Sequence, residues 1–323
     1  MDLLTFDEAL AEAGDDVSVL LGNGFSQAYD RTIFNYRSLL DNASFGIRDK
    51  NIKNIFKEFD TYDFEKVMSS LEHTEKVSRI YNADQLFIEC IIDDQVHLKN
   101  SLIRAITDTH PNRSSDVPDV SYEYAKDFAL NFKNIFTLNY DLLIYWVINK
   151  LSSSRRFDDG FRYDDGWTSP EYQNIFFVHG ALHLYEDTAG DTMKHIFREI
   201  YDSSIIDAVS GNLESNKFPL FVSEPSSVKK LNKIKKSPYL TNCYNSLANL
   251  AGSLFIYGHS MDENDAHIFI QLAKSDINKI YISIFGDANS ESNLDLMYRT
   301  AKYFRGKDIF FYSAQSTPIW NGV

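Results

Sequence analysis

Apolar positions along the chain fall into two alternating patterns. Short continuous apolar runs, typical of strands buried on both faces of a parallel sheet, predict strands at 19–21, 135–138, 174–178, 219–222, 253–257, 279–285 and 308–312. Between most of these runs, apolar residues recur at helical spacing. Strands that alternate with helices predict an α/β fold, here a Rossmann-type parallel sheet with helices on both faces.

Local signals mark where several helices begin. Thr5 and Glu8 match a capping box and predict a helix over 6–13, and Ser237-Pro238 has the serine cap and first-turn proline of a helix start. A helix should open at 27–31, and an acid-rich one after residues 258–260. Further helices are expected at 121–132, 142–148, 192–209 and 291–305.

Two stretches interrupt this alternation within an expected single domain over 1–323. Residues from about 34 to 118 show only helical spacing and predict a large helical insertion. Asp63 and Glu65 open one of its helices, and we interpret both mainly as acids that favour a helix start. A second insertion is expected at about 185–250. Its lysine-rich run over 229–236 fits a solvated helical face better than a partner-binding surface.

Composition excludes several classes of protein. Lys and Arg number 32 against 46 Asp and Glu, a formal charge of −14, so direct nucleic-acid binding is not expected. Backbone amides can still hold an anionic dinucleotide. Cys90 and Cys243 are the only cysteines, which excludes a four-cysteine zinc site. We find no leader and no apolar run of membrane-spanning length, so we expect a cytoplasmic protein with no membrane contact.

Polar clusters follow four of the predicted strands. They are Gly-Asn-Gly-Phe-Ser at 22–26, Thr-Leu-Asn-Tyr-Asp at 137–141, His-Gly at 179–180, and Gly-His-Ser at 258–260. The carboxyl ends of parallel strands share one edge, so these clusters should meet in one crevice. Singly they are weak signals: a Gly-Asn-Gly turn can simply join a strand to a helix, and a histidine can simply be buried. A metal pair of His179 and His183 is not favoured, because no carboxylate completes the set.

The order and spacing of these clusters resemble the sirtuin family, with its Gly-Ala-Gly-x-Ser loop, Thr-Gln-Asn-x-Asp segment, His-Gly, and late Gly-x-Ser. The resemblance covers about half of the chain and leaves out both insertions. It is nearest to the bacterial sirtuin-like proteins of anti-phage defence, which consume NAD⁺. It therefore implies an NAD⁺ glycohydrolase that releases nicotinamide and ADP-ribose.

The resemblance also implies a role for individual residues. Asn139 would orient the nicotinamide-side ribose, and His179 would contact its hydroxyls as general base or charge-stabilising partner; these two are the candidate catalytic residues. The residues implied to bind NAD⁺ are Gly22, Asn23, Gly24, Phe25 and Ser26 around the phosphates, Asp141 near the carboxamide, and Gly258 and Ser260 at the adenosine half. His259 and Asp262 are expected to be structural.

Departures from the sirtuin pattern limit these implications. Leu138 replaces a glutamine and Asn23 an alanine, and the paired cysteines of the sirtuin zinc ribbon are absent. No zinc is expected, protein deacylation becomes improbable, and water is the natural acceptor. Homo-oligomerisation and an associated ATPase or phage-derived trigger are expected by resemblance. Two alternatives stay open: a sensor that binds NAD⁺ or ADP-ribose without cleaving it, and an interaction subunit with a vestigial pocket.

Overall fold

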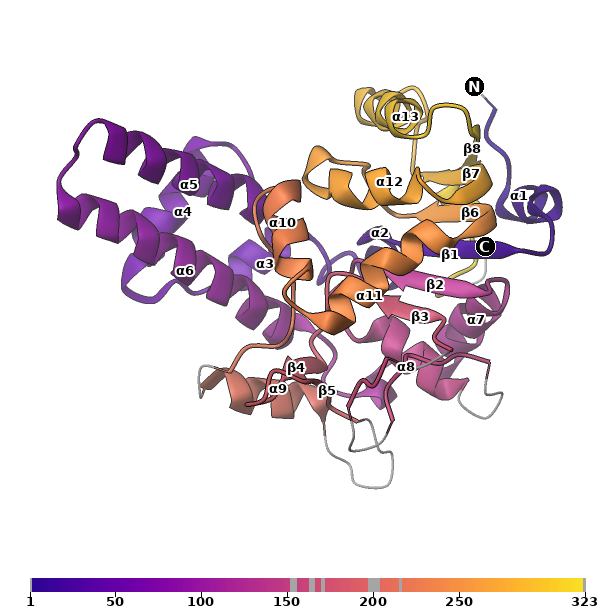
Figure 1. The fold of residues 1–323 in the computed structure, drawn as a ribbon, viewed down its shortest axis with the longest axis horizontal. Helices are drawn as coiled ribbons and strands as arrows, with labels where there is room; N and C mark the ends of the chain where they lie inside the picture. The colour runs from indigo at the N-terminus through magenta and orange to yellow at the C-terminus, as the bar shows by residue number, and fades with distance from the viewer. Residues whose placement is uncertain are drawn as a thin grey trace.

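A six-stranded parallel sheet forms the centre of the protein in the computed structural model, which describes residues 2–151, 156–162, 166–169, 172–196, 204–214 and 217–321 (Figure 1). The predicted Rossmann-type sheet is confirmed. Its strands are β1 (Val17–Leu21), β2 (Asn134–Thr137), β3 (Ile175–Phe177), β6 (Ala251–Tyr257), β7 (Asp276–Ile284) and β8 (Asp308–Ser313).

The order of the strands defines where a ligand crevice can open. From one edge to the other they run β3-β2-β1-β6-β7-β8, and every neighbouring pair is parallel. The short antiparallel pair β4 (Leu184–Glu186) and β5 (Thr192–Lys194) lies outside this sheet. Without that pair, the order is the 3-2-1-4-5-6 of dinucleotide-binding folds. The chain therefore leaves the middle of the sheet in opposite directions after β1 and after β6, and their carboxyl ends form the switch point.

Helices cover both faces of this sheet, as predicted. On one face, the Phe6 ring of α1 (Phe6–Ala13) and the Phe128 ring of α7 (Asp119–Leu130) are 5.6 Å apart, and Phe6 packs on Phe255 of β6. The other face carries α11 (Pro238–Ser246) and α12 (Ala266–Leu272) (Figure 1). The remaining helices next to the sheet are α2 (Gly24–Tyr29), α8 (Leu143–Lys150) and α13 (Glu291–Tyr303). No described helix has the length and apolar character needed to cross a bilayer.

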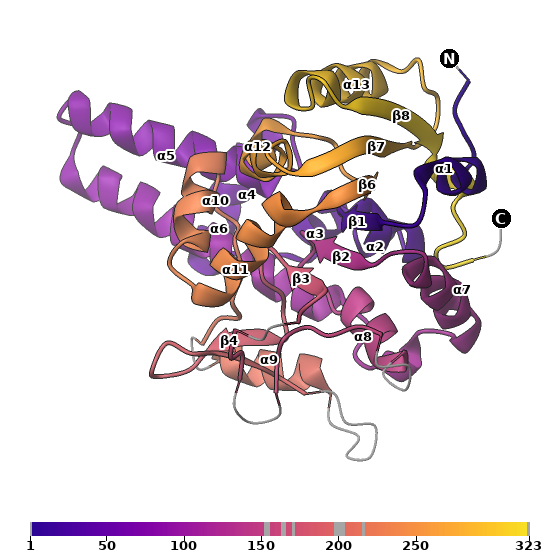
Figure 2. The same ribbon diagram turned by 45° about the vertical axis from the view of Figure 1, so that its right-hand side comes forward.

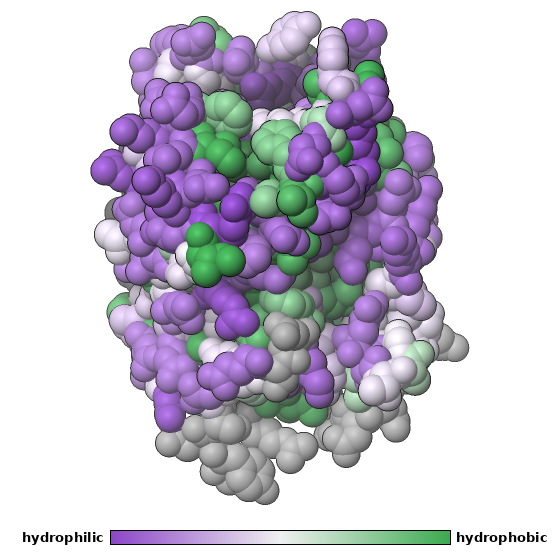
Figure 3. Space-filling view, turned by 90° about the vertical axis from the view of Figure 1, so that its left-hand side faces the viewer, coloured by the Kyte–Doolittle hydropathy of each residue, from purple (hydrophilic) through white to green (hydrophobic). Residues whose placement is uncertain are grey.

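The predicted helical block is present beside the carboxyl edge of the sheet. It contains α3 (Tyr36–Asn42), α4 (Asp49–Glu58), α5 (Phe64–Ile80) and α6 (Gln85–Thr109). Helices α5 and α6 form a long hairpin that extends away from the sheet (Figure 2). Figure 3 faces this side, where apolar patches interrupt a mostly hydrophilic surface. Exposed apolar side chains near the hairpin tip are Val77, Ile80, Tyr81, Leu86 and Phe87.

The region from about 185 to 250 differs from two predictions. The helix expected at 192–209 is wrong at its start, because Thr192–Lys194 forms β5, and α9 (Ile205–Glu214) begins later. Residues 197–203 lie outside the described part of the chain. The strand expected at 219–222 is only an isolated bridge between Phe221 and Gly180. Val222 N donates to His179 O (2.9 Å), so this segment holds the end of β3 without extending the sheet.

The lysine-rich run over 229–236 also differs from its prediction. It forms α10 (Ser227–Ile234) and continues to the start of α11, whose predicted Ser237 cap is present. Most of its lysines are solvated, but Lys230 is 1% exposed. The solvated-face interpretation is therefore wrong for Lys230, whose ammonium lies inside the site described below.

Candidate functional site

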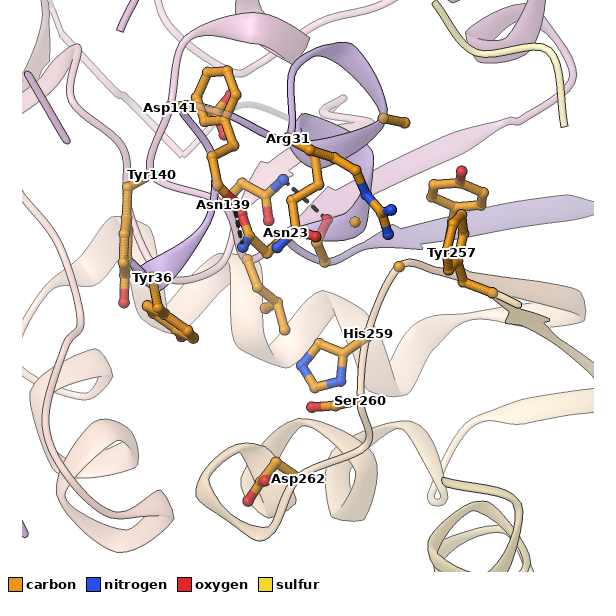
Figure 4. A pocket seen from close by; sticks show the side chains of 18 of the residues that line it. Asn23, Arg31, Tyr36, Asn139, Tyr140, Asp141, Tyr257, His259, Ser260 and Asp262 are labelled. Atoms are coloured by element: carbon orange, nitrogen blue, oxygen red, sulfur yellow. Dashed lines mark hydrogen bonds between the residues drawn. The ribbon is translucent and has the colours of Figure 1, made fainter. Parts of the chain in front are cut away.

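The four polar clusters that follow β1, β2, β3 and β6 line one cavity of about 940 Å³. Its floor is the switch point, where residues 22–24 follow β1 and residues 258–260 follow β6. Residues 139–141 and His179 form another side, and α3, α5 and α6 of the helical block close it. Figure 4 shows the labelled side chains from different elements facing this space. The volume lies within the range of small-molecule and cofactor pockets.

The glycines of the switch point are explained first by backbone packing. Gly24 N donates to Gly258 O (2.8 Å), and a Cβ on Gly22 would lie 2.6 Å from Gly258 O. A Cβ on Gly258 would lie 2.4 Å from Gly24 Cα, and its φ of +68° is one that side chains rarely adopt. Two loops from distant parts of the sequence therefore touch through glycine.

Gly258→Ala is expected to destabilise the fold, because it adds both a steric clash and left-handed strain. Gly286→Ala is the matched control, since Gly286 has a φ of +76° but nothing within 4 Å of its added Cβ. The control should cost about 1–2 kcal/mol, and Gly258→Ala more by about another 1–3 kcal/mol. Urea denaturation of both variants measures the difference. Equal losses would show that the loop contact relaxes without cost.

Asn139 is fixed by its amide nitrogen. Nδ2 donates to Gly22 O (3.0 Å) and to Ser26 Oγ (2.9 Å), and the Ser26 hydroxyl donates to Asp141. Asn139 lines the cavity, and its Oδ1 has no hydrogen-bond partner among the described residues. Because both N–H donors are engaged, the amide offers a ligand an acceptor only. That orientation is assigned from the hydrogen bonds.

The other residues around Asn139 support the loop. Asp141 uses both carboxylate oxygens, one for Ser26 and one for Leu143 N (2.9 Å) at the start of α8. Ser26 and Phe25 are buried and are not part of the cavity wall. The Phe25 ring packs 5.2 Å from that of Trp320. The expected contacts of Phe25 and Ser26 with phosphate thus have no counterpart in the cavity lining.

His179 meets a second histidine that the sequence did not indicate. Its Nε2 lies 3.2 Å from Nε2 of His267, and Ser227 Oγ accepts from His267 N at 2.8 Å. Burial holds the pKa of His179 well below its usual value and lowers that of His267 to about 4. Both imidazoles are therefore neutral near pH 7, and one donates to the other.

A buried ionic cluster, named here the Lys230 cluster, joins three parts of the fold in this cavity. The Lys230 ammonium lies 2.8 Å from Glu65 Oε1 of α5 and 2.9 Å from Asp265 Oδ1, which precedes α12. Asp265 Oδ1 is in turn 3.8 Å from His179 Nε2. His259 Nδ1 accepts from Met261 N (2.8 Å), so its Nε2 donates to Asp265 Oδ2 (3.1 Å).

The two carboxyl groups of the Lys230 cluster have opposite shifts. Burial, together with the charge of Asp265, raises the pKa of Glu65 to about 7 despite the attraction of Lys230. Burial would also raise the pKa of Asp265, but the Lys230 charge and the His259 hydrogen bond hold it well below its usual value. Asp265 is thus the ionised partner of Lys230 at neutral pH, and Glu65 exchanges a proton there.

These shifts predict opposite pH dependences of stability. The stabilisation from protonated Glu65 is present below its unfolded pKa and is lost as pH rises through about 7. The unfolding free energy of wild type relative to Glu65→Gln should therefore fall between about pH 4.5 and 7. The stabilisation from ionised Asp265 is lost as pH falls. The unfolding free energy of wild type relative to Asp265→Asn should therefore decrease toward acid pH. Urea titrations across pH 4–8 measure both, and slopes of the same sign would contradict the assignment.

Arg31 is the cation at another part of the cavity. Its guanidinium lies 4.1 Å from the centroid of the Phe285 ring, and it has no carboxylate partner among the described residues. In Figure 4 it lies toward Tyr257, away from Tyr36 and Tyr140. An arginine without a carboxylate partner can donate hydrogen bonds to phosphate oxygens. Arg31 thus supplies a positive charge at one part of the cavity, and Asp265 lies beside His179 at another.

A metal is geometrically conceivable at the histidines. His179, Asp265 and His267 each offer a ligand atom within 4.8 Å of the others, a donor set that zinc accepts. The Lys230 ammonium already binds Asp265, however, and an added dication would be repelled by it. His183, considered as a ligand from the sequence, lies elsewhere and stacks on Tyr145 (4.1 Å).

Sequence reasoning missed Arg31, Lys230, Asp265 and His267. A signal existed for Lys230, because helical spacing places it one turn before the apolar Ile234 and so on the buried face of α10. No comparable signal marks Asp265, which pairs with a lysine 35 positions away.

Residues 19–320 match the family described as "Domain of unknown function (DUF4917)", and the chain belongs to that family. None of the curated proteins matches the chain.

Proposed function

We propose that this member of a family of unknown function is an NAD⁺ glycohydrolase, which cleaves the nicotinamide–ribose bond with water. One observation carries the proposal: Asn139, with a free acceptor, and neutral His179 line the same cavity at the switch point of a 3-2-1-4-5-6 sheet. The sirtuin-like order of the polar clusters supports the same substrate.

The charges of the cavity favour one orientation of NAD⁺. The pyrophosphate would lie near Gly22 and Gly24 with Arg31. The ribose that carries the cationic nicotinamide ring would lie near His179 and Asp265. Cleavage develops positive charge at C1′, which an ionised carboxylate stabilises in a partly desolvated site. Asn139 Oδ1 would accept from a ribose hydroxyl, and His179 would contact the neighbouring hydroxyl.

We further propose a role in NAD⁺ depletion during anti-phage defence, under control of a homo-oligomer, an associated ATPase or a phage-derived trigger. Uncontrolled NAD⁺ hydrolysis would harm the host cell, and the helical block closes one side of the cavity. Light scattering of the purified protein with and without NAD⁺ tests the self-association. A monomer that is active without any trigger would contradict this regulation.

Nicotinamide release from NAD⁺ by the purified protein tests the activity itself, with chromatography to separate ADP-ribose from cyclic ADP-ribose. His179→Ala should lose about 10²-fold or more in kcat. His73→Ala, an exposed histidine on α5, is the control and should keep wild-type activity. Affinity for NAD⁺ without any product, in the presence of the native partner, would instead support the sensor alternative. No thermal shift with any nucleotide would support the interaction subunit.

A further inference from the structure

Glu65 is a cavity residue whose side chain the helix start does not need. Asp63 caps α5, accepting from Glu65 N (2.8 Å) and Lys66 N (3.2 Å), so the Glu65 carboxyl is free of that task. It crosses instead to the Lys230 ammonium of α10, and its side chain is 16% exposed. The interpretation of Glu65 as a capping acid therefore does not account for its position.

We propose that Glu65 is the general base that activates the attacking water in the NAD⁺ hydrolysis proposed above, on which this inference rests. The Glu65 carboxylate takes one proton from water as the water oxygen bonds to C1′. The C1′–N bond breaks, and its electron pair leaves with neutral nicotinamide. The products are nicotinamide, ADP-ribose and one proton, which Glu65 passes to solvent.

The geometry favours Glu65 over the other polar groups of the cavity. Asp141 uses both oxygens within the fold, and His259 uses both ring nitrogens. His179 Nε2 faces His267 at 3.2 Å. The Glu65 carboxyl contacts only the Lys230 ammonium among the described residues, and both of its oxygens keep lone pairs for a water. The same ammonium contacts Asp265, which lies beside His179.

The surroundings of Glu65 suit proton transfer near neutral pH. The charged and titratable groups that face it are Lys230, Asp265, Asp63, Tyr36 and Tyr140. Burial and the two aspartates raise its pKa to about 7, and Lys230 opposes the rise. A base with a pKa close to the working pH is the most effective. Asp265, held ionised, supplies the fixed negative charge.

Glu65→Gln tests the proposal, with Glu72→Gln as its matched control. Glu72 makes a second ion pair between α5 and α10, with Lys229, and is not part of the cavity wall. Glu65→Gln should lower kcat by about 10²-fold or more, leave ADP-ribose binding by calorimetry unchanged, and abolish the rise of kcat with pH near 7. Glu72→Gln should keep kcat and its pH profile.

The outcomes separate this inference from the proposed function. A wild type without nicotinamide release in any activated state overturns both. If the wild-type protein releases nicotinamide and Glu65→Gln keeps the wild-type kcat or its pH dependence, only the role of Glu65 as general base is overturned. If Glu65→Gln does not fold, Glu65→Asp provides the test. This variant keeps a carboxylate on a shorter side chain, so its kcat must be lower than that of wild type and must still rise with pH. A flat pH profile for Glu65→Asp would overturn the proposal.

Discussion

Lys230→Met is expected to lower the unfolding free energy by about 3–5 kcal/mol at pH 7.5, because it leaves two buried carboxyl groups without their cation. Methionine keeps the length and apolar stem of lysine and removes only the charge. The ammonium contacts both oxygens of Glu65 and Oδ1 of Asp265, and the side chain is 2% exposed. The loss should diminish toward acid, where protonation removes the uncompensated charge.

Lys229→Met is the matched control for that experiment. Lys229 is the neighbouring residue on α10, pairs with Glu72, and has a side chain that is 42% exposed. Its removal should cost about 0–1 kcal/mol, the value of an exposed ion pair. Urea denaturation followed by circular dichroism compares the two variants. Losses of equal size would mean that Lys230 is solvated in the folded protein.

Double variants assign the loss to the partners of Lys230. Adding Glu65→Gln or Asp265→Asn to Lys230→Met removes one of the stranded carboxyl groups, so each double variant should recover part of the stability. Asp265→Asn should recover more, because Asp265 is the partner that is ionised at neutral pH. Additive losses would instead show that the three groups do not interact.

The sheet could be predicted from the sequence because its strands are buried on both faces. Val19, Phe136, Phe255 and Ile282 lie in continuous apolar runs that give a clear signal. The segment at 219–222 gives a similar run but forms an isolated bridge at Phe221 instead of a strand, and no local pattern distinguishes the two. Thr192–Lys194 is short and half-polar, so its pairing with β4 is invisible without the tertiary structure.

The site could be predicted only in part, because its charges come from different elements. Strand order brings Asn139, His179 and Gly258 to one edge, and that order follows from the alternation. Lys230 and Glu65 are 165 positions apart, and only the docking of α5 and α10 brings them together. The close backbone contact of Gly22 and Gly24 with Gly258 could not be predicted, because no local pattern pairs two loops so far apart in the sequence.

Asn139→Ala is expected to reduce kcat for nicotinamide release by about 10²–10³-fold, the usual loss when a preorganised polar group that contacts the transition state is removed. Asn139 also holds Gly22 and Ser26, so a loss alone would not separate contact from support. Ser26→Ala makes that separation. It removes the hydrogen bonds of Ser26 with Asn139 and Asp141 and leaves the Asn139 amide bonded to Gly22.

The comparison of these two variants decides the role of Asn139. If Oδ1 contacts the ribose, Ser26→Ala should lose only about tenfold, the effect of one weakened hydrogen bond on position, and Asn139→Ala far more. Asn139→Asp retains an acceptor but loses both donors, so it should fall between them. Nicotinamide release measured at saturating NAD⁺, with melting temperatures for all three variants, gives the ranking. Equal losses for Ser26→Ala and Asn139→Ala would make Asn139 a support of the glycine turn, and the contact with NAD⁺ would then have to come from His179 and its neighbours.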